Sequence, residues 1–468
     1  MYRVKRLSIL LGVLAIVCIA TVWVLHLEER REQIENSGEV ILEIDANSVQ
    51  ELSWIYEGET LSFHRDEGWI YDGDEAFPVD EEKIQALLEQ FQAFSAAFII
   101  TDVEDYGQYG LDDPVCTIDL TAAEQSYEIL LGDYSTMDAQ RYVSIGDGNV
   151  YLAVSDPLDS FNTGLSDLID HDETPAFDQV NELVFTGAEH YSIFRQEDSS
   201  GSYSAEDIYF TQQDGQNLPL DTSRVDGYLD VIRYLGLTDY VTYHVTDEEL
   251  EQYGLDDPEL TVTVDYADEN EDGDMVSTTF SLSVSRDPQE RNTASETSAE
   301  ETDEEETVTA YVRVGQSQIV YQISSEEYRS LMAASYNDLR HQEVLWADFS
   351  DISQIDISLE GVDYTITSEE DGDTRTYCYQ EEEIDLTDLQ NAVEALTAEQ
   401  FTSETPTEQE EIRMTIHLDS ESFPEVDIQL YRYDGTYCLA VVDGEPVSLV
   451  QRSAVVNLME AVRVIVLN

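Results

Sequence analysis

The sequence predicts an α+β protein made of three tandem repeats, each a mostly antiparallel sheet with one or two packed helices, after one N-terminal transmembrane helix. Three observations lead to this prediction. They are an uncharged apolar run near the N-terminus, a heptapeptide that occurs twice, and a pattern of one helix followed by several strands that occurs three times. The 468 residues leave room for roughly three domains of ~100–200 residues each.

The apolar run predicts a transmembrane anchor over residues 7–26. The stretch from Leu7 to Leu25 has no charge and no proline, and as a helix it nearly matches a hydrocarbon core of about 30 Å. Basic residues precede it and acidic residues dilute the arginines after it, so the positive-inside rule places residues 1–6 in the cytoplasm. We therefore expect a single-pass protein of the cell membrane, with a polar stalk at 27–39 and the bulk of the chain extracytoplasmic.

Two other interpretations of the apolar run stay open. A cleaved signal peptide would have a shorter apolar region and a small-x-small site, for which Cys18-Ile19-Ala20 is a marginal candidate. A lipoprotein signal needs a small residue before its cysteine, and Val17 is not small. The apolar run continues past Ala20, which favours an anchor that is not cleaved.

The charge of the chain excludes one class of partner. There are 102 acidic and 21 basic residues, a formal net charge of −81. A surface this negative repels phosphate backbones, so we expect no nucleic-acid partner. The acidity indicates either a surface adapted to salt or to an acid-rich proteome, or a specific polycationic partner.

The cysteines and histidines show no metal or redox signature. None of the four cysteines forms a CxxC pair, and the seven histidines are scattered without HExxH or HxH. Cys378 and Cys438 fall in the same predicted repeat and would be able to pair in an oxidising compartment, although buried free thiols are the simpler interpretation. No nucleophile motif or phosphate loop occurs, so we expect no enzyme, no catalytic residue and no cofactor.

One heptapeptide, Gln-Tyr-Gly-Leu-Asp-Asp-Pro, occurs at Gln108–Pro114 and again, identically, at Gln252–Pro258. Such long-period identity indicates stacked copies of one structural unit. A shorter match between Asp167–His171 and Asp338–His341 supports the same interpretation.

The sequence before each heptapeptide repeats as well, and a third copy of this pattern follows. An aspartate that is predicted to cap a helix stands at Asp80, Asp221 and Asp385. In each copy the first apolar residue comes four positions later, and the next three lie at +3, +4 and +7, on one helix face. These apolar residues are Ile84, Leu87, Leu88, Phe91 and Phe94; Val225, Tyr228, Leu229, Ile232 and Leu235; and Leu389, Ala392, Val393 and Leu396.

Runs rich in Val, Ile, Tyr and Thr follow each helix, with the rough alternation of antiparallel strands that bury one face. In the first copy they are VCTIDL, SYEILL, RYVSI and NVYLAV, and each copy also opens with a short strand such as VQELSWIY. The predicted repeats span 40–172, 178–342 and 350–468, the third being divergent because it lacks the heptapeptide. An acidic low-complexity segment, 286–307, is expected to be a disordered loop within the second repeat.

The heptapeptide has a structural interpretation. Gly110 and Gly254 permit positive φ, and an aspartate before proline favours the extended geometry that leads into a strand. The leucines and tyrosines are expected to pack against the core. The predicted structural motif comprises Tyr109, Gly110, Leu111, Asp112, Asp113 and Pro114, and Tyr253, Gly254, Leu255, Asp256, Asp257 and Pro258. The alternative, in which the paired carboxylates bind a metal, has no other ligand at a fixed spacing.

One segment resembles a calcium loop. Asp268, Asn270 and Asp272, with a glycine next, match positions 1, 3, 5 and 6 of the D-x-N-x-D-G pattern, and Asp274 follows. Position 12 is Thr279 rather than glutamate, and two predicted strands flank the segment. An acidic hairpin tip is the simpler interpretation, and a weak calcium site is the alternative.

The YGLDDP turn and the stretch LLGDYSTMDAQRYVSIGDGNVYLAV resemble a bacterial family known as domain of unknown function 4340. Tandem copies behind an N-terminal transmembrane helix resemble that family's organisation too. The resemblance covers nearly all of the chain after the anchor and is weakest in the third copy. It implies no catalytic residues, and it implies association with a gliding-motility-like ABC export system.

We therefore expect a membrane-anchored, extracytoplasmic accessory or scaffold protein of the bacterial cell envelope, which works with an ABC-type export system and contacts envelope or transporter proteins. The alternative is a cell-surface binding module for a wall polymer, a glycan or a small ligand. An aromatic groove would favour the binding module, and a deep pocket with convergent polar groups would favour an enzyme.

Overall fold

The computed structural model describes residues 38–123, 125–197, 201–269, 273–291, 307–371, 374–420 and 422–467. Residues 7–26, where the anchor is predicted, lie outside these ranges. Within the described ranges no helix is long and apolar enough to cross a membrane. The chain divides after His171 into two compact units.

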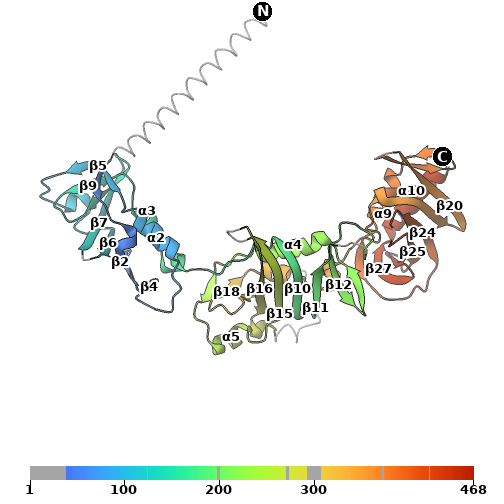
Figure 1. Cartoon of the computed structure of the whole chain (residues 1–468), viewed down its shortest axis with the longest axis horizontal. Helices are drawn as coiled ribbons and strands as arrows, with labels where there is room; N and C mark the ends of the chain where they lie inside the picture. The colour runs from blue at the N-terminus through green and yellow to red at the C-terminus, as the bar shows by residue number, and fades with distance from the viewer. Residues whose placement is uncertain are drawn as a thin grey trace, which may run out of the picture. The chain divides into compact units, whose positions relative to one another are not determined.

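The first unit contains one antiparallel sheet of nine strands, here called sheet one (Figure 1). Its strands are β1 (Glu39–Leu42), β2 (Val49–Tyr56), β3 (Glu59–Arg65), β4 (Trp69–Tyr71), β5 (Phe94–Ile100), β6 (Cys116–Ala122), β7 (Gln125–Ser135), β8 (Gln140–Ser144) and β9 (Val150–Ala153). The helical segments are η1 (Ala46–Ser48), α2 (Glu81–Glu89), η2 (Gly107–Tyr109), α3 (Leu158–Phe161) and η3 (Leu165–Leu168).

The second unit contains two more nine-stranded antiparallel sheets. Sheet two comprises β10 (Gln179–Gly187), β11 (Tyr191–Arg195), β12 (Tyr209–Gln213), β13 (Gln216–Pro219), β14 (Tyr240–Thr242), β15 (Leu260–Glu269), β16 (Met275–Arg286), β17 (Ala310–Val314) and β18 (Val320–Ile323). Its helices are α4 (Thr222–Arg233), α5 (Asp247–Tyr253), α7 (Ser325–Met332) and α8 (Tyr336–Leu339).

Sheet three comprises β19 (Ile352–Leu359), β20 (Val362–Asp371), β21 (Thr374–Tyr379), β22 (Glu382–Ile384), β23 (Ala398–Phe401), β24 (Glu410–Leu418), β25 (Glu425–Arg432), β26 (Tyr437–Val442) and β27 (Glu445–Gln451). Its helical segments are η4 (Phe349–Asp351), α9 (Thr387–Glu394) and α10 (Arg452–Leu467). The α+β class with repeated antiparallel sheets is therefore confirmed.

The three sheets share one strand order. It runs β5-β9-β8-β7-β6-β2-β3-β4, then β14-β18-β17-β16-β15-β10-β11-β12, then β23-β27-β26-β25-β24-β19-β20-β21. Sheet one adds β1 beside β5, and sheets two and three add β13 and β22 at the opposite edge. The copy that lacks the heptapeptide therefore keeps the topology of the other two. At the centre of each sheet the copy's first strand pairs with a late one, opposing Leu52 to Leu120, Leu183 to Val264, and Ile355 to Ile416.

Helix caps explain where two of the repeated helices begin. Asp80 caps α2 by accepting a hydrogen bond from the Lys83 backbone N–H, and Asp221 caps α4 by accepting from Ser223 and Arg224. The third cap was predicted wrongly. Leu386 occupies the N-cap position of α9 and makes no side-chain capping bond. Asp385 instead accepts from the backbone N–H and the hydroxyl of Thr387, a local turn that competes with capping.

The apolar residues predicted on these helices are all buried, each with 8% exposure or less. Four of them are not helical. Phe91, Leu235 and Leu396 follow the ends of α2, α4 and α9, and Phe94 begins β5. Every helix face nevertheless packs onto its own sheet and supplies that sheet's core. In sheet one, Trp54 stacks on Phe63 at 5.6 Å and meets the edge of Phe161 at 5.4 Å.

Several boundaries differ from the sequence-based expectation. Glu39, assigned to the stalk, begins β1, and Arg286, assigned to the acidic loop, ends β16 opposite Ala310. Residues 292–306 of that loop lie outside the described residues. Cys378 and Cys438 are free thiols on β21 and β26, which four strands separate. Helix α10 was not predicted, and it buries Ala454, Val455, Leu458, Ala461, Val462 and Ile465.

Candidate functional site

The repeated heptapeptide forms the end of a helical segment in both copies. Gly110 ends η2 and Gly254 ends α5, and both have a φ of +70°. The N–H of each glycine bonds to the carbonyl three residues back, and the N–H of the following leucine bonds five residues back. These two bonds are the Schellman arrangement, which places glycine in the left-handed region and an apolar residue after it.

The side chains of the heptapeptide follow the same division in both copies. Leu111 and Leu255 are buried. The ring of Tyr109 lies 5.0 Å from Tyr142 on β8, and the ring of Tyr253 lies 4.7 Å from Tyr311 on the equivalent strand β17. The four carboxylates, Asp112, Asp113, Asp256 and Asp257, are exposed. The geometry thus brings the glycines, leucines and tyrosines to the sheet and leaves the acids in solvent.

The calcium candidate is only partly described. Asn270 and Asp272 lie outside the described residues. Asp268 pairs with Val276 across the β15–β16 hairpin, and its Oδ1 already accepts a hydrogen bond from the Asp178 N–H at 3.1 Å. Asp274 follows the hairpin tip, and Thr279 donates to Asp265 on the facing strand rather than to the tip.

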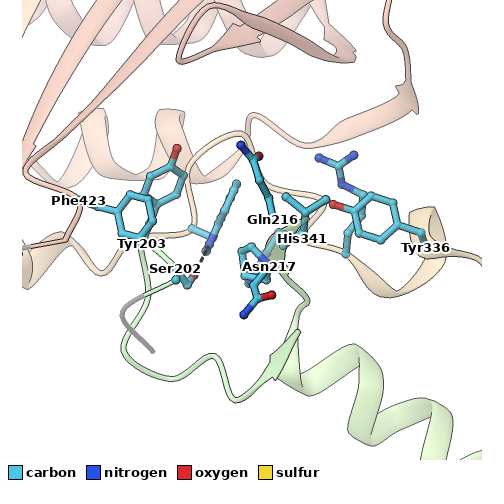
Figure 2. A pocket seen from close by; sticks show the side chains of 12 residues that line it. Ser202, Tyr203, Gln216, Asn217, Tyr336, His341 and Phe423 are labelled. Carbon is cyan, nitrogen blue, oxygen red and sulfur yellow. Dashed lines mark hydrogen bonds between the residues drawn. The ribbon is translucent and has the colours of Figure 1, made fainter. Parts of the chain in front are cut away.

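A pocket of about 350 Å³ lies in the second unit, where loops of sheets two and three meet. Its lining comes from the loop before β12, from β13, from α8 with the segment after it, and from the β24–β25 loop. Figure 2 shows Tyr203 beside Phe423 at one end and Tyr336 at the other, with Gln216, Asn217 and His341 between them. Aromatic walls with a few amide groups are typical of small-ligand sites.

A buried polar network fixes the centre of this pocket. The ring of His341 lies parallel to Trp346 at 4.6 Å, and its Nε2 lies 3.0 Å from Oδ2 of Asp207. Ser202 donates its hydroxyl hydrogen to the same carboxylate and accepts a hydrogen bond from Trp346 Nε1 at 3.1 Å. Ser202 and Asp207 are both buried, so the carboxylate is satisfied within the protein.

This network does not have the order of a nucleophilic triad. In a Ser-His-Asp triad the histidine stands between serine and carboxylate and removes the serine proton. Here the carboxylate of Asp207 stands between Ser202 and His341, so the histidine does not contact the hydroxyl oxygen. The arrangement orients the imidazole and the indole, and does not activate the serine.

The pocket also contains a cationic side chain, Arg340, which makes cation–π contacts with two aromatic rings. The guanidinium of Arg340 lies 4.9 Å from the ring centre of Tyr336 and 4.3 Å from that of Phe401. Burial lowers the pKa of Arg340 and raises that of Tyr336. At the opposite end, burial and the hydrogen bond to Asp443 raise the pKa of Tyr203, which stays a neutral phenol at physiological pH.

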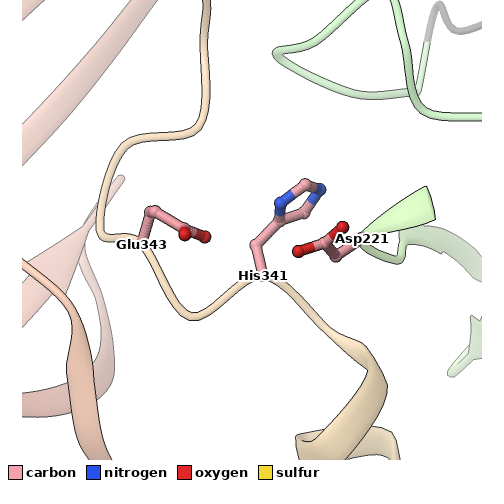
Figure 3. A group of neighbouring side chains, drawn as sticks. All are labelled: Asp221, His341 and Glu343. Atoms are coloured by element: carbon pink, nitrogen blue, oxygen red, sulfur yellow. The ribbon is translucent and has the colours of Figure 1, made fainter. Parts of the chain in front are cut away.

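Beside the pocket, His341 also belongs to a group with Asp221 and Glu343. One potential ligand atom from each of the three side chains lies within 4.8 Å of the others. Figure 3 shows both carboxylate groups directed toward the His341 side chain. All three residues are partly buried.

Sequence reasoning missed both the pocket and this group. It identified Asp221 as a helix cap and His341 as part of a short repeated segment, but it did not bring them together. A signal was present, since a His-x-Glu triplet follows the repeated Asp-Leu pair at His171–Glu173 and again at His341–Glu343. The partners Ser202 and Asp207 carried no signal, because they come from a distant loop, with Asp207 134 residues before His341.

Comparison with known proteins identifies a family. The family model described as a domain of unknown function (DUF4340) matches residues 69–207 and 211–415. No curated protein and no solved structure matches the chain. The two matched segments cover most of the first two sheets and reach into the third.

Proposed function

The chain belongs to the DUF4340 family, as the heptapeptide and the strands after it predicted, and from that premise we propose that it is a membrane-anchored, extracytoplasmic accessory protein of the bacterial cell envelope. In this proposal residues 7–26 span the membrane, and the three sheets form a scaffold that contacts components of an ABC-type export system. The apolar run and the basic residues before it support the orientation.

The observation that carries the scaffold proposal is the shared topology of the three sheets. Three copies of one fold in a single chain present three related surfaces, which suits simultaneous contact with several parts of an assembly. The net charge of −81 favours basic surfaces on those partners and makes association faster at low salt.

Two measurements test this proposal. Protease added to intact protoplasts should digest residues 40–468, and the same digestion after detergent lysis provides the control. Crosslinking in cells followed by purification of the full chain should enrich an ABC-transporter component over an unrelated single-pass protein of similar charge. Protection of the ectodomain in intact protoplasts would refute the orientation, and equal recovery with the control protein would refute the transporter partner.

A second candidate function is a binding module for a wall glycan or another small ligand, which the aromatic pocket favours. Its aromatic side chains offer stacking surfaces, while Gln216 and Asn217 on β13 offer exposed amides. Trp346 lines the pocket and would report on occupancy by its fluorescence. Soluble peptidoglycan fragments should shift this emission saturably, and Gln216→Ala should weaken the shift. An unchanged emission, or a shift that Gln216→Ala does not alter, would refute this candidate for that ligand class.

A further inference from the structure

The group of Asp221, His341 and Glu343 has three features that are expected of a metal site. It offers one imidazole nitrogen and two carboxylate oxygens, a donor set that suits a divalent transition ion. Its members come from two distant parts of the chain, so the fold rather than local sequence brings them together. In addition, the imidazole is held in place by a buried carboxylate outside the group.

The contact with Asp207 determines which nitrogen of His341 is available. A carboxylate only accepts hydrogen bonds, so Nε2 carries the proton in its 3.0 Å contact with Asp207 Oδ2. The neutral ring then has its lone pair on Nδ1. Histidines that bind metals commonly donate their other ring N–H to a carboxylate, which fixes the tautomer and the ring orientation. Stacking on Trp346 at 4.6 Å restrains the ring further.

Asp221 is also held in place, and one of its two carboxylate oxygens has only a side chain as its neighbour. Its Oδ1 accepts hydrogen bonds from the backbone N–H groups of Ser223 and Arg224 at the start of α4. Its Oδ2 faces the Arg224 side chain, with an Nε–Oδ2 distance of 3.4 Å. The Arg224 side chain is 42% exposed, so it is able to turn into solvent when a cation takes its place.

Glu343 is the adjustable member. Ligand atoms bound to zinc at about 2.0–2.2 Å lie roughly 3–3.5 Å from one another, somewhat closer than the 4.8 Å limit within which these three atoms lie. Asp221 and His341 are fixed by their hydrogen bonds. A glutamate side chain has three rotatable bonds, so Glu343 is the member that is able to move toward the other two.

We propose that Asp221, His341 and Glu343 bind one divalent transition ion, for which zinc has the best-matched preferences, with Asp207 orienting the histidine. Water would occupy the fourth position. The ion would connect the first turn of α4 in sheet two to the segment that leads from α8 into sheet three. It would thereby fix the path of the chain between the two sheets, and this role does not depend on the proposed function.

The test uses the full chain in detergent micelles, stripped of metal by a chelator and titrated calorimetrically with zinc chloride. Millimolar calcium and physiological salt are present throughout, to occupy the diffuse acidic surface. We expect one saturable zinc site per chain. Cobalt should bind at the same site with visible absorption bands and without a thiolate charge-transfer band, because no cysteine belongs to the group.

Conservative substitutions then distinguish zinc binding at this group from diffuse binding to the acidic protein surface. Asp221→Asn and Glu343→Gln should each weaken zinc binding about tenfold or more. Asparagine caps a helix as well as aspartate does, so Asp221→Asn should leave α4 intact. The matched control is Asp348→Asn at the cap of η4, which should bind zinc like the wild type. Arg224→Gln should tighten binding because it removes the competing cation.

Each alternative outcome overturns the proposal. The absence of a saturable site above the calcium background would show that the group is an ordinary acidic cluster. Equal affinity in the wild type, Asp221→Asn and Glu343→Gln would place the zinc elsewhere. A thiolate band in the cobalt spectrum would assign binding to a cysteine instead.

Discussion

Replacing Gly110 by alanine should destabilise sheet one by more than the same change at another left-handed glycine. Gly110 has a φ of +70°, a region that costs an alanine about 1–2 kcal/mol. A Cβ there would also lie 2.8 Å from the backbone nitrogen of Asp133 on β7, and backbone gives way at a cost of about 1–3 kcal/mol. The expected total is about 2–5 kcal/mol.

Gly146 provides the matched control in the same sheet. It has a φ of +78°, and no atom lies within 4 Å of the place that an alanine Cβ would take. Gly146→Ala should therefore show the conformational cost alone, about 1–2 kcal/mol. Gly254 should fall between the two, because its closest neighbour at 2.8 Å is the rotatable hydroxyl of Ser285.

The assay is urea denaturation of the full chain. The buried indoles of Trp54 and Trp69 report on sheet one, and hydrogen exchange of β15 and β16 amides reports on sheet two. Asp112→Asn, an exposed change in the same heptapeptide, should cost much less. Equal losses of stability in Gly110→Ala and Gly146→Ala would refute the argument that the close approach of Gly110 to β7 adds to the cost of substitution.

Three further predictions concern packing and charge. Gly227→Ala, inside α4 and facing open space, should raise the free energy of unfolding by about 0.5–1 kcal/mol, measured by thermal unfolding. Asp156→Ala leaves the buried Arg141 without its carboxylate and should cost about 3–5 kcal/mol, while adding Arg141→Met should recover part of that loss. Burial opposes the ionisation of Glu259, but hydrogen bonds from Arg286 hold the pKa of Glu259 below its ordinary value of 4.5. Glu259→Gln should therefore be less stable than the wild type at pH 7, and this difference should vanish as the pH falls from about 4.5 through the lower folded pKa.

The local parts of the fold followed directly from the sequence. An aspartate four residues before an apolar helix face identified α2 and α4, and alternating β-branched residues identified the strands after them. The predictions failed where two local preferences competed. The Asp385 side chain accepts a hydrogen bond from Thr387 in a local turn instead of capping α9. Phe94 fits the helical spacing of apolar residues, yet it is the first residue of strand β5. Helix α10 lies at the end of the divergent copy. Among the described residues, the other two copies contain no long helix at the equivalent position, so the comparison of repeats did not predict it.

The candidate site was less accessible to sequence reasoning. The seven histidines are ordinary in number and scattered in position, and carboxylates are so frequent that their proximity in sequence carries no information. What distinguishes His341 is its parallel contact with Trp346 and its bond to a carboxylate from another loop. The contact with Asp207 depends on the folded chain, which brings the segment after α8 beside the loop before β12.

The strand order shared by the three copies also sets the sequence in which they complete folding. In each copy the opening hairpin emerges from the ribosome first, but its central partner follows roughly 60–80 residues later. At a synthesis rate of about 5–20 residues per second, the first strand of the hairpin has one unpaired edge for about 3–16 s, until its late partner strand is made. An earlier copy therefore closes before the late strand of the next copy is made. The vectorial order of synthesis thus limits cross-pairing between copies, whereas refolding from denaturant exposes all three opening hairpins to all three late strands at once.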